Sequence, residues 1–173
     1  PKAIICEKPI SSSLNQAKQM VQSANSNNCS LIVNYVRRFE PGVNEIKNKI
    51  TDNYFGDFYK GIVWYSKGLI NNGSHFIDLL IYLFGDVSEI NIISKGRSLN
   101  NGDFEPDLSI KFGKTFVIFV ACKEENYEIN EIELVGEKGS IRYSNGGESI
   151  KYRLTKKSST FKDYVILNNK EKV

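Results

Sequence analysis

The stretch GLINNGSHFIDLL, residues 68–80, holds the only histidine in this chain of 173 residues. Glycines and asparagines precede a run of apolar side chains that continues to Phe84 and stops at Gly85, a residue type that commonly ends helices. The run predicts a helix from about Gly73 to Phe84 that is apolar on most sides, and helices of this kind are normally buried. The fold must therefore supply a core around this helix.

A polar stripe interrupts the apolar surface of the predicted helix. At about 100° per residue, four polar side chains fall on one face: Asn71, His75, Asp78 and Tyr82. The stripe would enter the interior, where polar groups cost free energy unless they find partners. It is either a structural network, for example between His75 and Asp78, or the lining of a cleft. In a cleft His75 would exchange protons, because the ordinary histidine pKa suits proton transfer near neutral pH.

The segments before this helix predict a β-α-β unit. An apolar strand at 2–6, which we expect to be fully buried, is followed by helical spacing over 13–25 and by a second strand at 31–35. Two strands joined through a helix pair in parallel.

The rest of the chain predicts an α+β fold. Pro41 begins another helix, residues 57–65 form a strand, and after Val87 short β-branched or aromatic segments alternate with turns. We therefore expect a mostly antiparallel open sheet with helices on one face. Its later strands are predicted at 88–95, 107–112, 114–122, 128–135, 139–144 and 149–154, with tight hairpins at 112–114 and 137–140.

Composition and charge exclude several functional classes. The net charge of +3 comes from 23 basic and 20 acidic residues that are spread along the chain, whereas nucleic-acid binding needs clustered cations. No apolar run has the length of a membrane span, and the N-terminus does not resemble a signal peptide. Cys6, Cys29 and Cys122 lack the paired spacing of a zinc or redox site, so we expect three reduced, buried thiols in a cytoplasmic protein. A single histidine without a paired carboxylate cluster offers too few ligands for a metal-dependent hydrolase.

Charged residues follow both strands of the predicted β-α-β unit. Lys8 follows the first strand and Arg37 and Arg38 follow the second, at the edge where open α/β sheets bind ligands. Lys8 is either a surface charge or a ligand contact, and the arginines are either solvated, paired with Glu40, or donors to an anion or hydroxyl group. Pro9 makes the peptide bond after Lys8 a candidate for the cis form.

Four segments together resemble the Gfo/Idh/MocA family of nicotinamide-dependent sugar and cyclitol oxidoreductases. They are CysGluLysPro at 6–9, AsnTyrValArgArgPhe at 34–39, AsnAsnGlySerHisPheIleAsp at 71–78 and ValGlyGluLysGlySerIle at 135–141. The resemblance implies that residues 1–35 are the C-terminal remnant of a dinucleotide-binding Rossmann domain, contributing its last β-α unit. It also implies that residues 36–173 are the substrate-binding and catalytic α+β domain.

The resemblance also implies catalytic roles. Lys8 matches the active-site lysine beside the nicotinamide, and His75 matches the histidine that exchanges the hydroxyl proton while hydride moves. Asn71 stands where many members have an aspartate, and an amide cannot raise the basicity of His75 as a carboxylate does. Some members that act on nucleotide-linked or surface-polysaccharide sugars resemble this chain in having asparagine here, which favours that substrate class.

Further contacts are implied by the same resemblance. The implied substrate contacts are Arg37, Arg38, Asn71 and Tyr127. The implied cofactor contacts are Glu7, Lys8 and Pro9, and no metal is implied.

No G-x-G-x-x-G motif occurs in the sequence, so the cradle for the cofactor pyrophosphate is missing. We therefore expect a fragment of an enzyme that uses NAD or NADP, inactive by itself and homo-oligomeric through the open sheet face. The alternative is a non-catalytic binding or oligomerisation module derived from the same fold. A glycine fingerprint encoded upstream would favour the enzyme, and its absence would favour the module.

Overall fold

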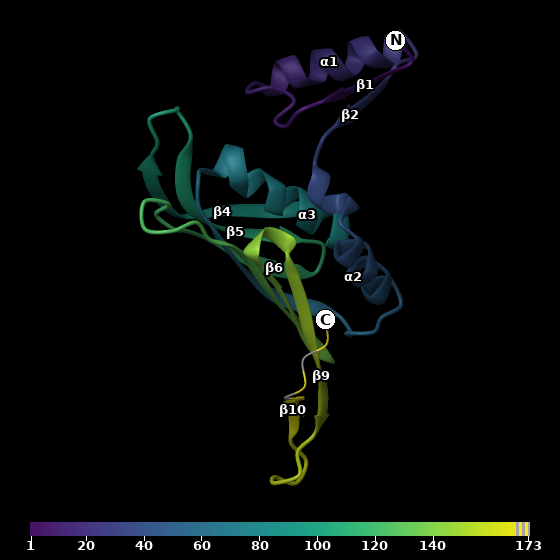
Figure 1. The fold of residues 1–173 in the computed structure, drawn as a ribbon, viewed down its shortest axis with the longest axis vertical. Helices are drawn as coiled ribbons and strands as arrows, with labels where there is room; N and C mark the ends of the chain where they lie inside the picture. The colour runs from purple at the N-terminus through teal and green to yellow at the C-terminus, as the bar shows by residue number, and fades with distance from the viewer. Residues whose placement is uncertain (169, 171, 173) are drawn as a thin grey trace. The chain divides into compact units, whose positions relative to one another are not determined.

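The computed structural model describes residues 1–168, 170 and 172, and the chain divides into two compact units, Pro1–Val36 and Arg37–Val173. The first unit contains strand β1 (Ala3–Cys6), helix α1 (Leu14–Ser26) and strand β2 (Ser30–Val33) (Figure 1). The two strands pair in parallel, with Cys6 opposite Val33. The predicted β-α-β unit is confirmed.

The expectation that the first strand is fully buried is wrong for this unit. Ile5 in β1 is 71% exposed, and the unit buries the side chains of only Ala24 and Cys29 among its described apolar residues. Two strands and one short helix have too little apolar surface to cover both faces of the strand pair. A groove of about 920 Å³ lies along α1 and the strands, lined by Ile4 and Met20 among others.

The cysteines also depart in part from expectation. All three thiols are free, as predicted, but only Cys29 is buried, and Cys6 and Cys122 are half-buried. Burial raises the pKa of the Cys122 thiol.

The second unit is built on an eight-stranded sheet, and the predicted fold class is confirmed. The strand order is β10-β9-β8-β7-β3-β6-β5-β4, with every neighbouring pair antiparallel except β3 and β6. The strands are β3 (Phe58–Tyr65), β4 (Val87–Ser98), β5 (Phe104–Phe112), β6 (Thr115–Ala121), β7 (Asn130–Gly136), β8 (Gly139–Ser144), β9 (Ser149–Lys157) and β10 (Val165–Leu167).

The central position of β3 does not follow the order of the chain. Lys60 of β3 lies opposite Phe116 of β6 on one side and opposite Val135 of β7 on the other. Each partner is more than 50 residues away along the sequence, so no local signal reports the pairing. The predicted hairpins at 112–114 and 137–140 are confirmed, because they join β5 to β6 and β7 to β8.

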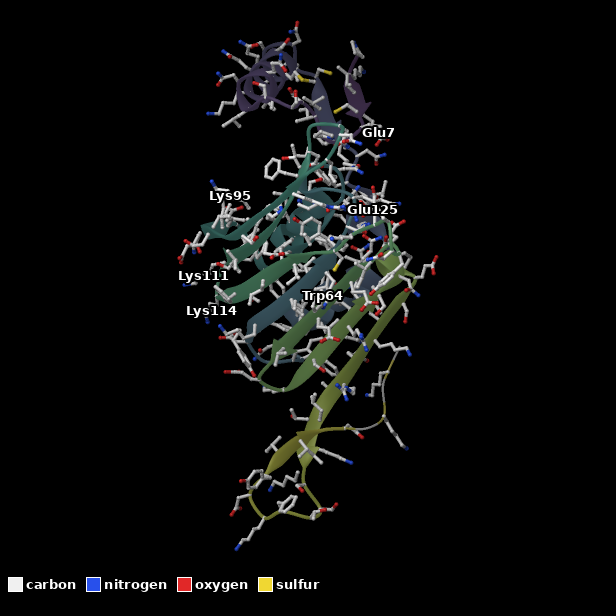
Figure 2. All side chains as sticks on the ribbon, turned by 90° about the vertical axis from the view of Figure 1, so that its left-hand side faces the viewer. Glu7, Trp64, Lys95, Lys111, Lys114 and Glu125 are labelled. Atoms are coloured by element: carbon white, nitrogen blue, oxygen red, sulfur yellow. The ribbon has the colours of Figure 1, made fainter. Side chains whose placement is uncertain are left out.

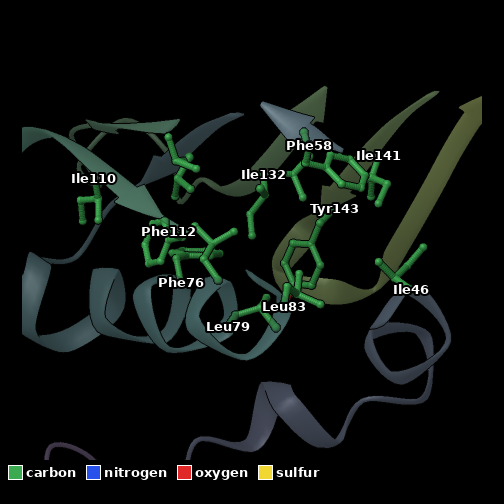
Figure 3. Close-up of a cluster of buried hydrophobic side chains, with 14 of the residues drawn as sticks. Ile46, Phe58, Phe76, Leu79, Leu83, Ile110, Phe112, Ile132, Ile141 and Tyr143 are labelled. Atoms are coloured by element: carbon green, nitrogen blue, oxygen red, sulfur yellow. The ribbon is translucent and has the colours of Figure 1, made fainter. Parts of the chain in front are cut away.

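Helices cover one face of this sheet (Figure 1). They are the 3-10 helix η1 (Val36–Phe39), α2 (Pro41–Thr51), the π-helical turn η2 (Leu69–Gly73), α3 (Ser74–Phe84) and the 3-10 turn η3 (Asn145–Gly147). The core lies between α3 and the strands, where Phe76, Leu79 and Leu83 meet side chains such as Phe112 and Ile132 (Figure 3). Among the helices formed by the described residues, none is long and apolar enough to cross a membrane.

Replacing a core residue of α3 should destabilise the protein far more than replacing an exposed residue of similar size. Leu80 is fully buried, whereas Ile92 on edge strand β4 is exposed. We expect Leu80→Ala to lower the free energy of unfolding in urea by about 2–5 kcal/mol, through lost contacts and the cavity that remains. Ile92→Ala should change it by less than about 0.5 kcal/mol. Equal effects of the two substitutions would contradict this core.

Candidate active site

A π-helical turn leads directly into the helix that carries the histidine. The turn, Leu69–Gly73, is closed by a bond from the Gly73 N–H to the Gly68 carbonyl (3.0 Å), and it presents Asn71 exposed to solvent. His75, the second residue of α3, is half-buried one turn later. Single π-turns within helices occur frequently at functional sites.

Two buried carboxylates hold the start of this turn. Asp103, just before β5, accepts the backbone N–H groups of Ile70 (3.0 Å) and Asn71 (2.9 Å). Glu105 of β5 accepts that of Gly68 (3.2 Å). Asp103 is only 6% exposed and Glu105 only 3%. The first N–H groups of a helix have no partner within the helix, so these carboxylates satisfy donors that the turn itself leaves unpaired.

Neither Asp103 nor Glu105 was predicted as a site residue from the sequence. Helix-capping patterns are local, within about three residues of the helix start, whereas these two carboxylates come from a strand about 30 residues downstream. A PheGluPro segment in a strand gives no sign that the preceding aspartate reaches a helix.

The polar stripe does not enter the interior, contrary to expectation. The buried face of α3 consists of Phe76, Leu79, Leu80 and Leu83. Asn71 is exposed, and His75, Asp78 and Tyr82 are half-buried. The predicted helix is confirmed. The sheet covers only one face of it, so the polar stripe on the opposite face lies next to solvent.

Asp78 forms an ion pair with Arg38. Arg38 Nε donates to Asp78 Oδ2 (2.6 Å) and Arg38 Nη2 donates to Asp78 Oδ1 (2.5 Å). The two side chains are 34% and 13% exposed, and the guanidinium lies 5.6 Å from the ring centre of Tyr82. This two-point ion pair joins η1 to α3 and fixes the orientation of the arginine.

Arg37, next to Arg38 in η1, contacts the π-turn and α3. Its Nη2 donates to Asn72 Oδ1 (3.3 Å), and its guanidinium stacks 4.4 Å from the ring centre of Phe76. Burial raises the pKa of the nearby Glu40 carboxyl, and the positive charge of Arg37 opposes that rise. Arg37 Nη1 is buried and has no hydrogen-bond partner among the described residues, so it keeps a donor available.

A shallow groove of about 430 Å³ lies at the start of β7, where Tyr127 is exposed. Asn130 in its wall accepts a hydrogen bond from Asn72, which in turn accepts one from Arg37. These amides connect the groove to the arginine. The sequence did not single out either asparagine. The groove is lined by Tyr127, Glu128, Ile129, Asn130, Glu131 and Asn145.

The segment after β1 belongs to the first unit. Glu7 Oε1 accepts a hydrogen bond from Asn34 Nδ2 (2.8 Å), so residues that follow the two parallel strands meet at their carboxyl ends. The peptide bond between Lys8 and Pro9, a candidate for the cis form, is cis. Lys8 is half-buried in the first unit and His75 belongs to the second, so their joint role remains a prediction.

No set of three or more histidine, cysteine, aspartate or glutamate side chains within the described part of the chain could hold a metal ion.

Two family profiles match this chain. The profile described as the C-terminal alpha/beta domain of the Gfo/Idh/MocA oxidoreductase family matches residues 66–163, more than half of the chain. The chain belongs to this family. The profile described as the family's NAD-binding Rossmann fold matches residues 1–35. The predicted nicotinamide cofactor is thus confirmed at the level of the family.

Individual relatives are similar over most of this chain. It is 27% identical to scyllo-inositol 2-dehydrogenase (NAD(+)) of Bacillus subtilis over 81% of its length and 47% of that protein. Its fold is similar to an inositol dehydrogenase homologue of Azotobacter vinelandii complexed with NADH and myo-inositol (TM-score 0.76, 13% identity, 96% of this chain, 49% of that one). It is also similar to the WlbA dehydrogenase of Bordetella pertussis with NADH and UDP-GlcNAcA (TM-score 0.71, 18% identity, 84% and 53%). The matched part spans about half the length of each.

We expect a double-mutant cycle to show that the Arg38–Asp78 pair contributes to stability. Replacing each residue and then both by alanine should give a coupling energy of about 1–2 kcal/mol in urea unfolding, because the ion pair is bidentate and partly buried. The control is the monodentate ion pair between Lys49 and Glu45 on α2 (3.0 Å), which should give a coupling energy of less than about 0.5 kcal/mol. Equal coupling energies would argue against a special role for Arg38–Asp78.

Proposed function

We propose that this chain is the substrate-binding and catalytic portion of an oxidoreductase. The reaction transfers a hydride between NAD or NADP and a hydroxyl or keto carbon of a sugar, nucleotide sugar or cyclitol. The observation that carries the proposal is the anchored π-turn, which presents Asn71 to solvent and places His75 at the start of α3. Membership of the oxidoreductase family supports it.

His75 acts as the acid or base in this proposal. When an alcohol is oxidised, the hydroxyl proton passes to the imidazole while the carbon–hydrogen bond breaks and its electron pair leaves as hydride. A bound nicotinamide would supply the hydride acceptor. Lys8 donates to the reacting oxygen and favours its negative charge as the proton leaves. In reduction the same groups act in reverse, and His75 returns the proton to the oxygen.

Asn71, Arg37, Arg38 and Tyr127 contact the substrate in this proposal. Asn71 offers an exposed amide that both donates and accepts, which suits a hydroxyl group. Arg37 keeps a buried donor, and Tyr127 stands over the groove that the asparagines connect to that arginine. Asp78 binds two donors of Arg38 and so orients its guanidinium for that contact. The amide of Asn71 and the hydroxyl of Tyr127 are uncharged hydrogen-bonding groups, which suit a ligand rich in hydroxyl groups.

Residues 1–35 fit the edge of a nucleotide site but not all of it. The carboxyl ends of β1 and β2 lie side by side, where open α/β sheets bind nucleotides, and Glu7, Lys8 and Pro9 follow β1 there. Glu7 suits a ribose hydroxyl, and Lys8 suits the nicotinamide end. The glycine cradle for the pyrophosphate does not occur in this sequence. We therefore propose that residues 1–173 alone are inactive and that the complete protein binds the cofactor.

The substrate class is drawn from the site and from the relatives together. The names of the relatives include scyllo-inositol and UDP-GlcNAcA, both of which are rich in hydroxyl groups. Asn71, in place of a carboxylate, leads us to favour a nucleotide-linked sugar and a role in surface-polysaccharide biosynthesis. The three free thiols suit the reducing conditions of the cytoplasm.

Replacing His75 in the complete protein tests the acid–base role. We expect His75→Ala to lower kcat/KM by about two to four orders of magnitude in NAD(P)H-linked assays with cyclitols and sugars. Tyr82→Phe is the matched control on the same face of α3, and it removes only a hydrogen bond to Asn44 (2.9 Å). That variant should keep kcat/KM within about threefold. Near-normal turnover by His75→Ala would overturn the assignment.

The open face of the sheet is the proposed surface for homo-oligomers. Ile62 and Trp64 on β3 alternate with the fully buried Val63 and Tyr65, so they point away from the helices. Trp64 is labelled in Figure 2. Ile118 of β6 lies opposite Ile62 and extends the same apolar surface. Large apolar patches on a sheet face commonly mark protein–protein contacts.

A charge placed on this face should dissociate the oligomer. We expect Ile118→Glu to give a smaller species than the unmodified protein in sedimentation velocity, because the glutamate would be buried in the interface. Ile92→Glu, an equal change at an exposed position on edge strand β4, should leave the species unchanged. A monomeric unmodified protein, or an Ile118→Glu variant of unchanged size, would contradict the proposed interface.

A further inference from the structure

The carboxylate of Asp103 accepts hydrogen bonds from three backbone N–H groups. It accepts those of Ile70 (3.0 Å) and Asn71 (2.9 Å) in the π-turn, and that of Phe104 (2.8 Å), the first residue of β5. Ile70 and Asn71 lie about 30 residues earlier in the chain. One nearly buried side chain therefore ties the start of β5 to the residues that precede His75.

Gly68 and Asp103 form a complementary pair. Gly68 stands before the turn with φ +87°, and a Cβ on it would lie 2.1 Å from Asp103 Oδ2. Any side chain at position 68 would therefore displace the carboxylate. Because Gly68 has no side chain to cap the turn, the N–H groups at its start depend on Asp103 and Glu105.

These bonds determine where the catalytic side chains point. The Gly68 carbonyl accepts a bond from Gly73, five residues later (3.0 Å), in addition to the four-residue bond from Asn72 (3.0 Å) that an α-helix would have. If the turn relaxed to α-helical geometry, residues before it would shift by one position relative to α3, a rotation of about 100°. Asn71 and His75 would then no longer keep their present relation to each other. Holding the turn in its π form is consequently a requirement of the site.

Glu105 supports the turn less directly. Its other carboxylate oxygen accepts from Arg97 Nε (2.6 Å), and Arg97 also pairs with Glu125. Much of the charge of Glu105 is therefore taken up by an arginine. The Asp103 carboxylate faces the positive end of the helix that begins at the turn, a favourable position for a negative group.

We infer that Asp103 is a positioning residue for the reaction proposed above, holding the π-turn that sets Asn71 and His75 in place. The inference rests on the proposed function, since it concerns how His75 and Asn71 are placed. Asp103 itself contacts backbone rather than substrate. Its loss should therefore slow turnover more than it weakens binding, because misplacing a reacting group by about 1 Å can cost about a hundredfold in rate.

The test compares two aspartates of the same region in the complete protein. Asp103→Asn preserves size but replaces one acceptor oxygen with an NH₂ group that cannot accept from the turn. Asp107→Asn is the matched control, because Asp107 Oδ1 also accepts a backbone N–H, that of Ala121 (2.9 Å), but away from the turn. We expect Asp103→Asn to lower kcat by about 10- to 100-fold with KM and the dissociation constant for NADH within about threefold. Asp107→Asn should keep kcat within about twofold.

Amide hydrogen exchange supplies a readout that does not depend on activity. The amides of Ile70 and Asn71 should exchange at least about tenfold faster in Asp103→Asn and be unchanged in Asp107→Asn. Unchanged exchange would overturn the inference. Faster exchange with normal kcat would also overturn it, because Asp103 would then be purely structural. If Asp103→Asn does not fold, Gly68→Ala tests the same contact from the other side and should lower kcat without changing KM.

The two proposals fail in different ways. Normal turnover by His75→Ala would overturn the proposed function. Impaired turnover by His75→Ala together with normal turnover by Asp103→Asn would overturn only the positioning role.

Discussion

The burial of one face of α3 against the sheet is the constraint on which the rest of the second unit depends. Phe76, Leu79, Leu80 and Leu83 pack against residues from strands far apart in the chain. Burial of such side chains is the main favourable term in folding. Since this face must point inward, the opposite face has to meet solvent, and His75 and Asp78 lie there. The core thus decides which side of the helix is available for chemistry.

Charged side chains orient the segments that do not pack into the core. Asp78 holds Arg38, and Asp103 holds the turn before His75, so each carboxylate restrains an element that apolar packing alone would not orient. Such contacts are directional, whereas apolar contacts are not. An acid–base group needs both kinds of restraint, because its rate depends on position as well as on pKa. Arg37, with a guanidinium stacked on Phe76, combines the two in one side chain.

Local patterns predicted much of this architecture and little of its long-range pairing. The apolar run ending at Gly85 identified α3, and turn residues identified the hairpins, because both signals lie within a few residues. The insertion of β3 beside β6 has no such signal. Asp103 was not predicted for the same reason, since its partners are backbone groups of a segment far away in the sequence. The burial of Ile5 was overestimated, because an apolar strand predicts that its side chains pack against something but does not identify the packing partner. His75 and Lys8 came from the family resemblance as much as from their spacing.

The central place of β3 has a consequence for the order in which the chain can assemble. β4, β5 and β6 are successive strands and can pair as soon as each turn closes. β3 is made earlier, yet its two edges are paired only with β6 and β7, so it waits until the chain has been synthesised to Gly136. Both edges of this apolar strand are open until β6 is complete at Ala121, and one edge stays open until β7 is complete, which is when aggregation competes with folding. On the ribosome, β3 would be the strand most in need of protection by a chaperone.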